Sequence, residues 1–153
     1  NSRSMASPPL SLRRAVAVPP VASTSPRVTA RPIPVPSRDG RRLFVNDTAR
    51  QHIRVFDVKG DGGLSGGAVW AETTGEGKGA PDGMKIDSAG HVYCCGPGGI
   101  HVFSPEAVCL GVIHAPQYVA NFAWGDADYR SLYITASTSV YRIRVATPGL
   151  PAD

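Results

Sequence analysis

Two oxygen-bearing side chains, Asp82 and Asn121, are the strongest candidates for chemistry in this sequence. Asp82 stands in a Pro-Asp-Gly turn, where Pro81 fixes φ before it and Gly83 lets the backbone turn without a Cβ clash. An alternating run follows the turn and is typical of a β-strand. The carboxylate is therefore expected at the mouth of a strand, where binding sites are commonly built.

The chemistry of this pair would be that of hard oxygen ligands. A carboxylate beside an amide carbonyl suits a divalent cation such as calcium, magnesium or manganese, although two ligands hold a metal poorly. Asp and Asn also commonly cap turns by accepting backbone N–H groups, and local spacing alone favours that interpretation for both residues. The four histidines lack the close spacing of a ligand pair, and the three cysteines fit no metal motif, so buried structural thiols are expected.

Repeated pairs of short apolar runs supply the elements that must position these residues. The first runs of the pairs begin at residues 43, 92 and 132, in steps of 49 and 40 residues. A second, alternating run follows each one eight to ten residues later, and no helical periodicity intervenes. Short strands recurring at about 40–50 residues are typical of a β-propeller, whose repeats are four-stranded blades.

The predicted fold is therefore all-β, a partial propeller of about two to three four-stranded antiparallel blades. One blade is predicted to consist of strands over residues 83–87, 91–95, 99–104 and 108–115, and the next blade to begin at 120–124. Of three blades, two are expected to be incomplete. Asp82 and Asn121 then occupy equivalent positions at the entrances to the innermost strands of adjacent blades.

Composition divides the chain into a basic segment and a nearly neutral remainder. Residues 1–42 hold eight Arg and one acid, a charge of +7, whereas the rest carries −3. Residues 1–38 contain eight of the fourteen prolines and are expected to form a disordered tail, or a targeting or artefactual segment. The propeller is assigned to residues 39–147 and a C-terminal tail to 148–153.

The sequence restricts the possible binding partners and the cellular compartment only in part. No aromatic residue precedes Phe44, so the arginines lack the stacking platform of a nucleic-acid binder. No run approaches the roughly 18 apolar residues of a membrane span. Neither nucleic acid nor membrane is expected as a partner, and the compartment stays open, with the cytoplasm favoured over an organelle or the periplasm.

Residues 39–145 resemble the C-terminal half of the gluconolactonase and regucalcin-like family of six-bladed propellers. The resemblance rests on PDGM at 81–84, GPGGI at 96–100 and LYITAS at 132–137. It implies hydrolysis of a sugar lactone with one divalent metal ion: calcium, or magnesium, manganese or zinc. It further implies that Asp82 is a metal ligand and the general base, and that Asn121 lines the substrate site.

The sequence also departs from that family. The place of an upstream metal-binding Asn is filled by residues 27–36, which contain neither Asn nor Glu, and the first blades are absent. The resemblance thus predicts an incomplete metal site and a weakly active or inactive fragment. The alternative is a non-catalytic binding or assembly module that associates with itself or another chain through exposed sheet edges.

Overall fold

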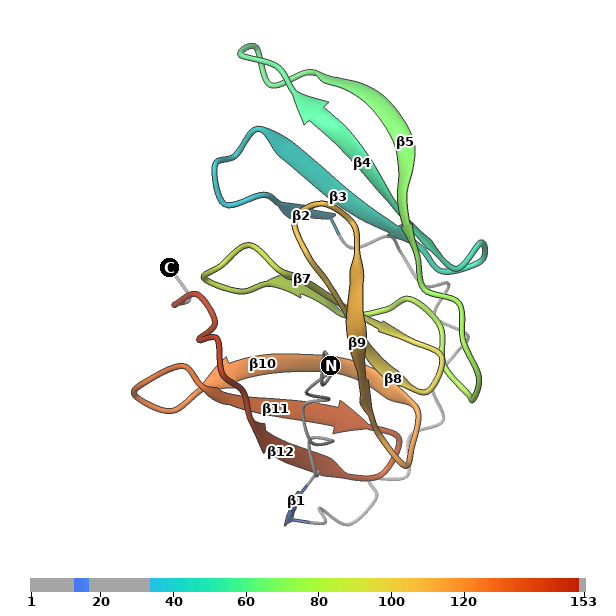
Figure 1. Cartoon of the computed structure of the whole chain (residues 1–153), viewed down its shortest axis with the longest axis vertical. Coiled ribbons are helices and arrows are strands. Elements are labelled where there is room, and N and C mark those ends of the chain that lie inside the picture. Colours follow the sequence, from blue (N-terminus) through green and yellow to red (C-terminus); the bar gives the residue numbers. More distant parts are fainter. Residues whose placement is uncertain (1–12, 17–33, 152–153) are drawn as a thin grey trace, which may run out of the picture.

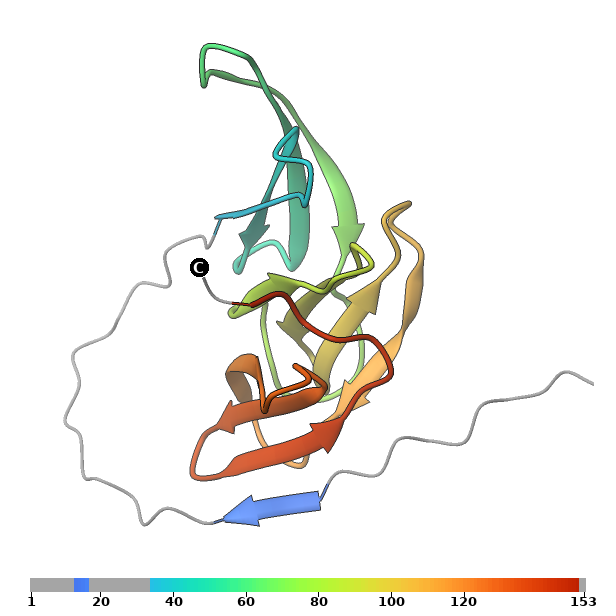
Figure 2. The same cartoon turned by 90° about the vertical axis from the view of Figure 1, so that its left-hand side faces the viewer.

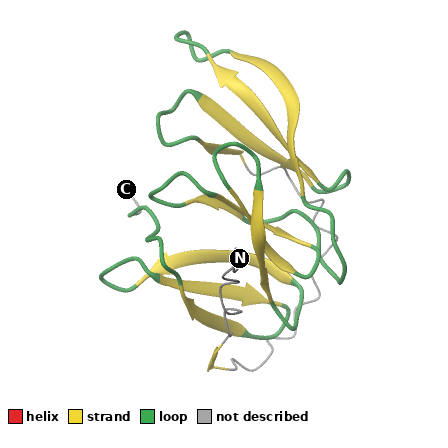
Figure 3. Ribbon diagram, viewed as in Figure 1, coloured by secondary structure: helices red, strands yellow, loops and turns green. Residues whose placement is uncertain are grey.

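The computed structural model describes residues 13–16 and 34–151, which are built from β-strands joined by loops and turns (Figures 1 and 3). That part of the chain has no helix of the length and apolar character needed to cross a membrane. The strands are β1 (Arg13–Val16), β2 (Pro34–Pro36), β3 (Arg42–Asp47), β4 (His52–Val58), β5 (Leu64–Glu72), β6 (Met84–Ile86), β7 (Val92–Gly96), β8 (Gly99–Phe103), β9 (Cys109–His114), β10 (Val119–Gly125), β11 (Ser131–Ala136) and β12 (Val140–Arg144).

The strands form three antiparallel sheets of four strands each. The first sheet has the order β2-β3-β4-β5, the second β6-β7-β8-β9 and the third β10-β11-β12-β1. Figure 1 shows the sheets one above the other, with the first sheet at the top. This arrangement confirms the predicted all-β partial propeller, and each sheet corresponds to one blade.

The prediction that two blades are incomplete is wrong, because two short strands complete them. In the first sheet β2 pairs with β3, placing Pro34 opposite Val45 and Pro36 opposite Leu43. Proline is tolerated there because β2 is an edge strand, where a missing N–H need not break the ladder. In the third sheet β1 pairs with β12, as Figure 2 also shows.

Structured residues also lie on both sides of the range that was expected to form the propeller. Strands β1 and β2 lie within residues 1–38, for which no secondary structure was expected, and the remaining calls on residues 1–12 and 17–33 fall outside the described part. At the other end, Gly149 forms a β-bridge with Asp87, and Pro148 accepts a hydrogen bond from the Ser88 N–H. Residues 148 and 149 therefore pack on the second sheet.

Two apolar cores lie between neighbouring sheets, one on each face of the second sheet. Phe44, Met84 and Phe103 contribute to the core between the first and second sheets. Phe122 and Leu132 contribute to the core between the second and third sheets. Successive side chains of a strand point to opposite faces, so the central sheet is apolar on both sides.

The cysteines follow the same alternation. Cys94 and Cys95 are adjacent on β7, and they are buried in the first and the second core respectively. Cys109 is exposed because it begins β9, the outermost strand of its sheet. The prediction of buried thiols is thus wrong for Cys109.

Candidate functional site

The Pro-Asp-Gly turn lies where β6 begins, and main-chain hydrogen bonds join it to the third sheet. The Gly83 N–H donates to the carbonyl oxygen of Ala120 at 2.9 Å. The Gly83 carbonyl in turn accepts a hydrogen bond from the Cys95 N–H at 2.9 Å. The turn is therefore fixed both to the beginning of β10 and to its own neighbour, β7.

Two side chains, one from strand β3 and one from the turn directly after it, contact the other side of the Pro-Asp-Gly turn. Asn46, on β3, is 1% exposed, and its Nδ2 donates a hydrogen bond to the carbonyl oxygen of Asp82. The hydroxyl of Thr48 donates to the carbonyl oxygen of Pro81 at 2.9 Å. All three sheets consequently contribute to the position of Asp82.

Asn121 lies directly against the turn, so the structure brings the two predicted site residues together. A Cβ added to Gly83 would stand 2.4 Å from Asn121 Oδ1 and 2.8 Å from Asn121 Cα, closer than real atoms approach. Only glycine therefore fits at residue 83. Asn121 itself is exposed, and its Oδ1 accepts a hydrogen bond from the N–H of Phe122 at 2.8 Å.

The groups around the Asp82 carboxylate are neutral ones. Burial raises the pKa of the Asp82 carboxyl, and no cation in the described part of the chain opposes that shift. Tyr118 has a pKa raised by burial and then by the charge of Asp82. Burial likewise raises the pKa of Cys94 to about 12. A half-buried carboxylate of raised pKa is a stronger base than one in water, which suits it to proton abstraction.

Sequence reasoning did not identify Asn46, Thr48 or Tyr118 as part of this site. One signal was available for Asn46. It stands two residues after Phe44 on the same strand, so alternation places both side chains on the core face. A polar side chain on a core face requires a buried partner, and the Asp82 carbonyl is that partner.

The residues present do not make up a complete site for a divalent metal. Calcium takes six to eight oxygen ligands, and magnesium requires near-octahedral oxygen coordination. Asp82 is the one carboxylate at the turn, while the Asn121 oxygen already accepts a backbone hydrogen bond. Within residues 34–151, no three His, Cys, Asp or Glu side chains are grouped so as to hold a metal ion.

Comparison with known proteins finds one family model over most of the propeller. Residues 35–138 match the SMP-30/Gluconolactonase/LRE-like region. A gluconolactonase of Zymomonas mobilis is 41% identical over 73 residues, which are 46% of this chain and 20% of that protein. The pentonolactonase XacC of Haloferax volcanii is 33% identical over 105 residues, 66% of this chain and 36% of that protein.

Solved structures agree with the fold. A gluconolactonase of Xanthomonas campestris superposes with a TM-score of 0.66 at 26% identity, covering 76% of this chain and 38% of that one. A calcium-binding protein, regucalcin of Agrobacterium tumefaciens, gives a TM-score of 0.66 at 18% identity, covering 76% of this chain and 46% of that one. The chain thus spans less than half the length of each of these relatives.

Proposed function

Because the chain belongs to the SMP-30/gluconolactonase/LRE-like family, we propose that its three sheets form part of a sugar lactonase in which Asp82 is the general base. The observation that carries the proposal is the half-buried Asp82 carboxylate, whose pKa burial raises, at the point where three sheets meet. The gluconolactonase and pentonolactonase relatives supply the substrate class, a cyclic ester of a sugar acid.

In the proposed reaction, Asp82 accepts a proton from the water that attacks the lactone carbonyl carbon. The new C–O bond produces a tetrahedral oxyanion, and its collapse breaks the ring C–O bond. The leaving alkoxide takes up the proton that Asp82 accepted, which restores the carboxylate, and the product is the open-chain hydroxy acid. General-base assistance of this kind contributes about 10²–10⁴-fold in rate. Asn121, which contacts Gly83, lines the place where the sugar would lie.

We further propose that this chain alone is weakly active or inactive. Asp82 supplies one carboxylate, and the Asn121 side-chain oxygen already accepts a hydrogen bond from the backbone, so a divalent ion lacks most of the oxygen ligands it requires. The sugar is also contacted from one side only, which weakens its positioning against Asp82. Calcium, magnesium, manganese or zinc should therefore have little effect on the isolated chain, and activity should need further sheets that complete the propeller around Asp82.

A fused protein tests both parts of this proposal. Residues 34–151 would follow the preceding sheets of the Zymomonas gluconolactonase in a single polypeptide, and gluconolactone opening would be followed by acid release in a pH-stat. The fusion should turn over and depend on a divalent ion, whereas the isolated chain should not. In the fusion, Asp82→Ala should lower kcat by about 10²–10⁴-fold. Unchanged turnover of Asp82→Ala would remove Asp82 from the mechanism.

A second candidate function, assembly, is favoured by the outward face of the first sheet. We define this face as Leu43, Val45, Phe56 and Val69, which cross-strand pairing and alternation place away from the core that contains Phe44. Val69 is 51% exposed. Arg54 lies between Val45 and Val69 in the cross-strand pairing, so this face combines apolar side chains with one cation. Exposed apolar side chains next to polar ones commonly mark protein interaction surfaces. We propose a second copy of the chain as the occupant, since one patch can serve both partners of a two-fold dimer.

Light scattering after size-exclusion chromatography would measure this association. Val69→Glu should shift a dimer toward monomer, because it places a charge within the apolar face. Leu110→Glu is the matched control, since Leu110 is 56% exposed on the second sheet and lies outside the face. A monomer at all concentrations, or equal dissociation by both variants, would reject assembly through this face.

A further inference from the structure

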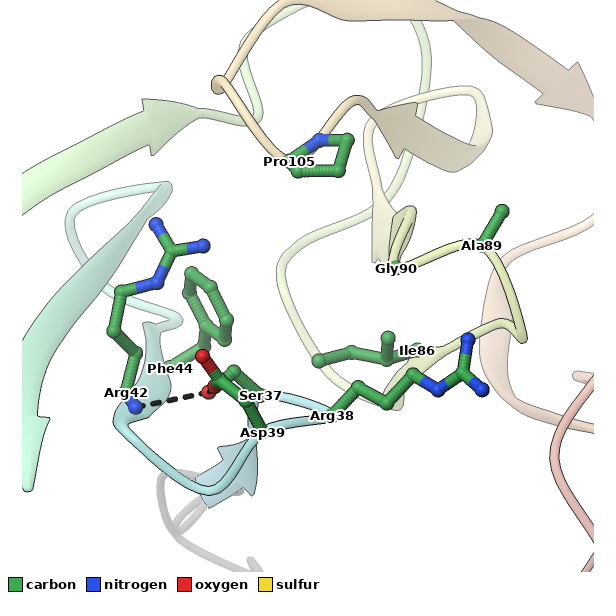
Figure 4. A pocket seen from close by; sticks show the side chains of 9 residues that line it. All are labelled: Ser37, Arg38, Asp39, Arg42, Phe44, Ile86, Ala89, Gly90 and Pro105. Carbon is green, nitrogen blue, oxygen red and sulfur yellow. Dashed lines mark hydrogen bonds between the residues drawn. The ribbon is translucent and has the colours of Figure 1, made fainter.

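A cavity that is separate from the Asp82 turn lies between the first and second sheets (Figure 4). It has a volume of about 440 Å³, within the range of small-molecule sites. Ser37, Arg38 and Asp39 from the turn between β2 and β3 line it, together with Ala89 and Gly90 from the turn after β6. Asp82 precedes β6, so the strand separates the turn from this cavity.

The inner wall of the cavity is apolar. Phe44 and Ile86 line it, and they are 2% and 7% exposed because they also belong to the core between the first two sheets. Pro105 stands across from them in Figure 4. Because little of Phe44 and Ile86 is exposed, a ligand here would contact a small apolar part of each, together with the partly buried Pro105.

Two arginines provide positive charge at the cavity. Arg42 holds its guanidinium Cζ 5.5 Å from the centroid of the Phe44 ring, and Arg38 donates a hydrogen bond to the carbonyl oxygen of Ser88. Figure 4 shows the two side chains on different sides of the cavity. Neither guanidinium forms a salt bridge with any residue in the described ranges.

The single acid of the cavity does not neutralise both arginines. Asp39 Oδ1 accepts hydrogen bonds from the Ser37 hydroxyl at 2.6 Å and from the Arg41 N–H at 3.1 Å. These bonds lower the pKa of the Asp39 carboxyl, so it stays ionised at neutral pH. Two cations against one anion leave the lining with a net positive charge.

We propose that this cavity binds a small organic carboxylate with an apolar body. Guanidinium groups pair with carboxylates through charge-assisted hydrogen bonds, and the planar fork of arginine matches the two oxygens. The wall of Phe44, Ile86 and Pro105 accepts the ring or chain that carries the carboxylate. The proposal concerns neither Asp82 nor Asn121, so it is independent of lactone hydrolysis.

Calorimetric titration of the full chain with three probes tests the ligand class. Benzoate carries both a carboxylate and an apolar ring, benzyl alcohol retains the ring without the charge, and inorganic phosphate has the charge without the ring. Benzoate should bind with a saturable isotherm and at least about tenfold more tightly than either other probe, since one charge-assisted contact corresponds to about that factor. Absence of benzoate binding, or equal affinity for phosphate or benzyl alcohol, would overturn the proposal.

Three glutamine variants locate the binding. Arg38→Gln and Arg42→Gln should each weaken benzoate binding about tenfold. Arg41→Gln is the matched control, because it removes the same charge from an exposed neighbour that does not line the cavity. If Arg41→Gln weakens binding as much as the other two, the effect is general charge attraction and the cavity is not the site. Arg38 is exposed, so its variant remains informative even if Arg42→Gln disturbs folding.

Discussion

The side-chain amide of Asn46 donates a hydrogen bond to the main-chain carbonyl oxygen of Asp82, linking the first sheet to the turn that begins the second. Asn46 is buried, whereas the Asp82 side chain is partly exposed. The amide therefore contributes by holding the backbone under the carboxylate. A precisely placed carboxylate at a strand mouth depends on this contact from a neighbouring sheet.

Replacing Asn46 by Ala should destabilise the chain by about 1–3 kcal/mol, because the Asp82 carbonyl loses its buried donor. The free energy of unfolding from urea denaturation measures this change. Thr138→Ala is the control: Thr138 is exposed and its hydroxyl accepts a hydrogen bond from Gln117, so its effect should stay within about 0.5 kcal/mol. Equal effects of the two substitutions would show that Asn46 has no special structural role.

Gly83→Ala should cost about 1–3 kcal/mol of stability, since its methyl group would collide with Asn121. In the active fusion it should also lower kcat/KM, because Asn121 and the turn must move apart. Gly60→Ala is a matched control, as nothing lies within 4 Å of the added Cβ. That variant should be neutral or slightly stabilising. A fully stable Gly83→Ala chain would contradict the tight contact between turn and β10.

Cysteine reactivity should separate Cys109 from the other two thiols. Cys109 is exposed, whereas burial raises the pKa values of Cys94 and Cys95 and shields both from solvent. Iodoacetamide at pH 8 should add one group per folded chain, and mass spectrometry should locate it on Cys109. The Cys109→Ser variant should stay unmodified until it is unfolded. Rapid labelling of Cys94 in the folded chain would indicate that the first core opens.

Most of the strands could be predicted from the sequence because their alternation is local. The strands expected at 91–95, 99–104 and 108–115 are observed as β7, β8 and β9, with ends shifted by one residue or none. The pairing of β1 with β12 could not be predicted, since it joins Arg13 to Arg142 and no local pattern marks such distant partners. Strand β2 was not predicted because its prolines argue against a strand. Proline is disfavoured in interior strands only, and β2 is an edge strand.

The contact between the Asp82 turn and Asn121 could be predicted from the repeat. Asp82 and Asn121 occupy equivalent positions of a repeat, and a repeat places equivalent positions side by side around an axis. The role of Asn46 depends on a main-chain carbonyl as its partner, and every residue has such a carbonyl. Alternation along β3 can mark Asn46 as a buried polar residue, but it cannot identify which carbonyl oxygen Asn46 contacts. The Arg38 and Arg42 cavity likewise forms only when two turns from different sheets meet.

Asp82→Asn should increase the free energy of unfolding at pH 7 while it removes lactonase activity from the fusion. Burial raises the folded-state pKa of Asp82 above its unfolded value, so ionisation opposes folding. The protonated carboxyl favours the folded state at low pH, and that advantage disappears as pH rises through the raised pKa. The neutral amide avoids the free-energy cost of burying an ionised carboxylate. The gain in the free energy of unfolding should therefore be present at pH 7 and absent at pH 3. Urea unfolding at both pH values measures it.

On the third sheet, Asp128→Asn should change the stability of the chain in the opposite direction. Hydrogen bonds from Arg144 lower the pKa of Asp128 to about 2, so its ionised form favours the folded state. The stability that Asp128 contributes is present above its unfolded pKa and is lost as pH falls toward 2. Asp128→Asn should therefore destabilise the chain slightly at pH 7 and have less effect at pH 3. If Asp82→Asn destabilises the chain at pH 7 as Asp128→Asn does, burial does not control the ionisation of Asp82, and its assignment as a strengthened base fails.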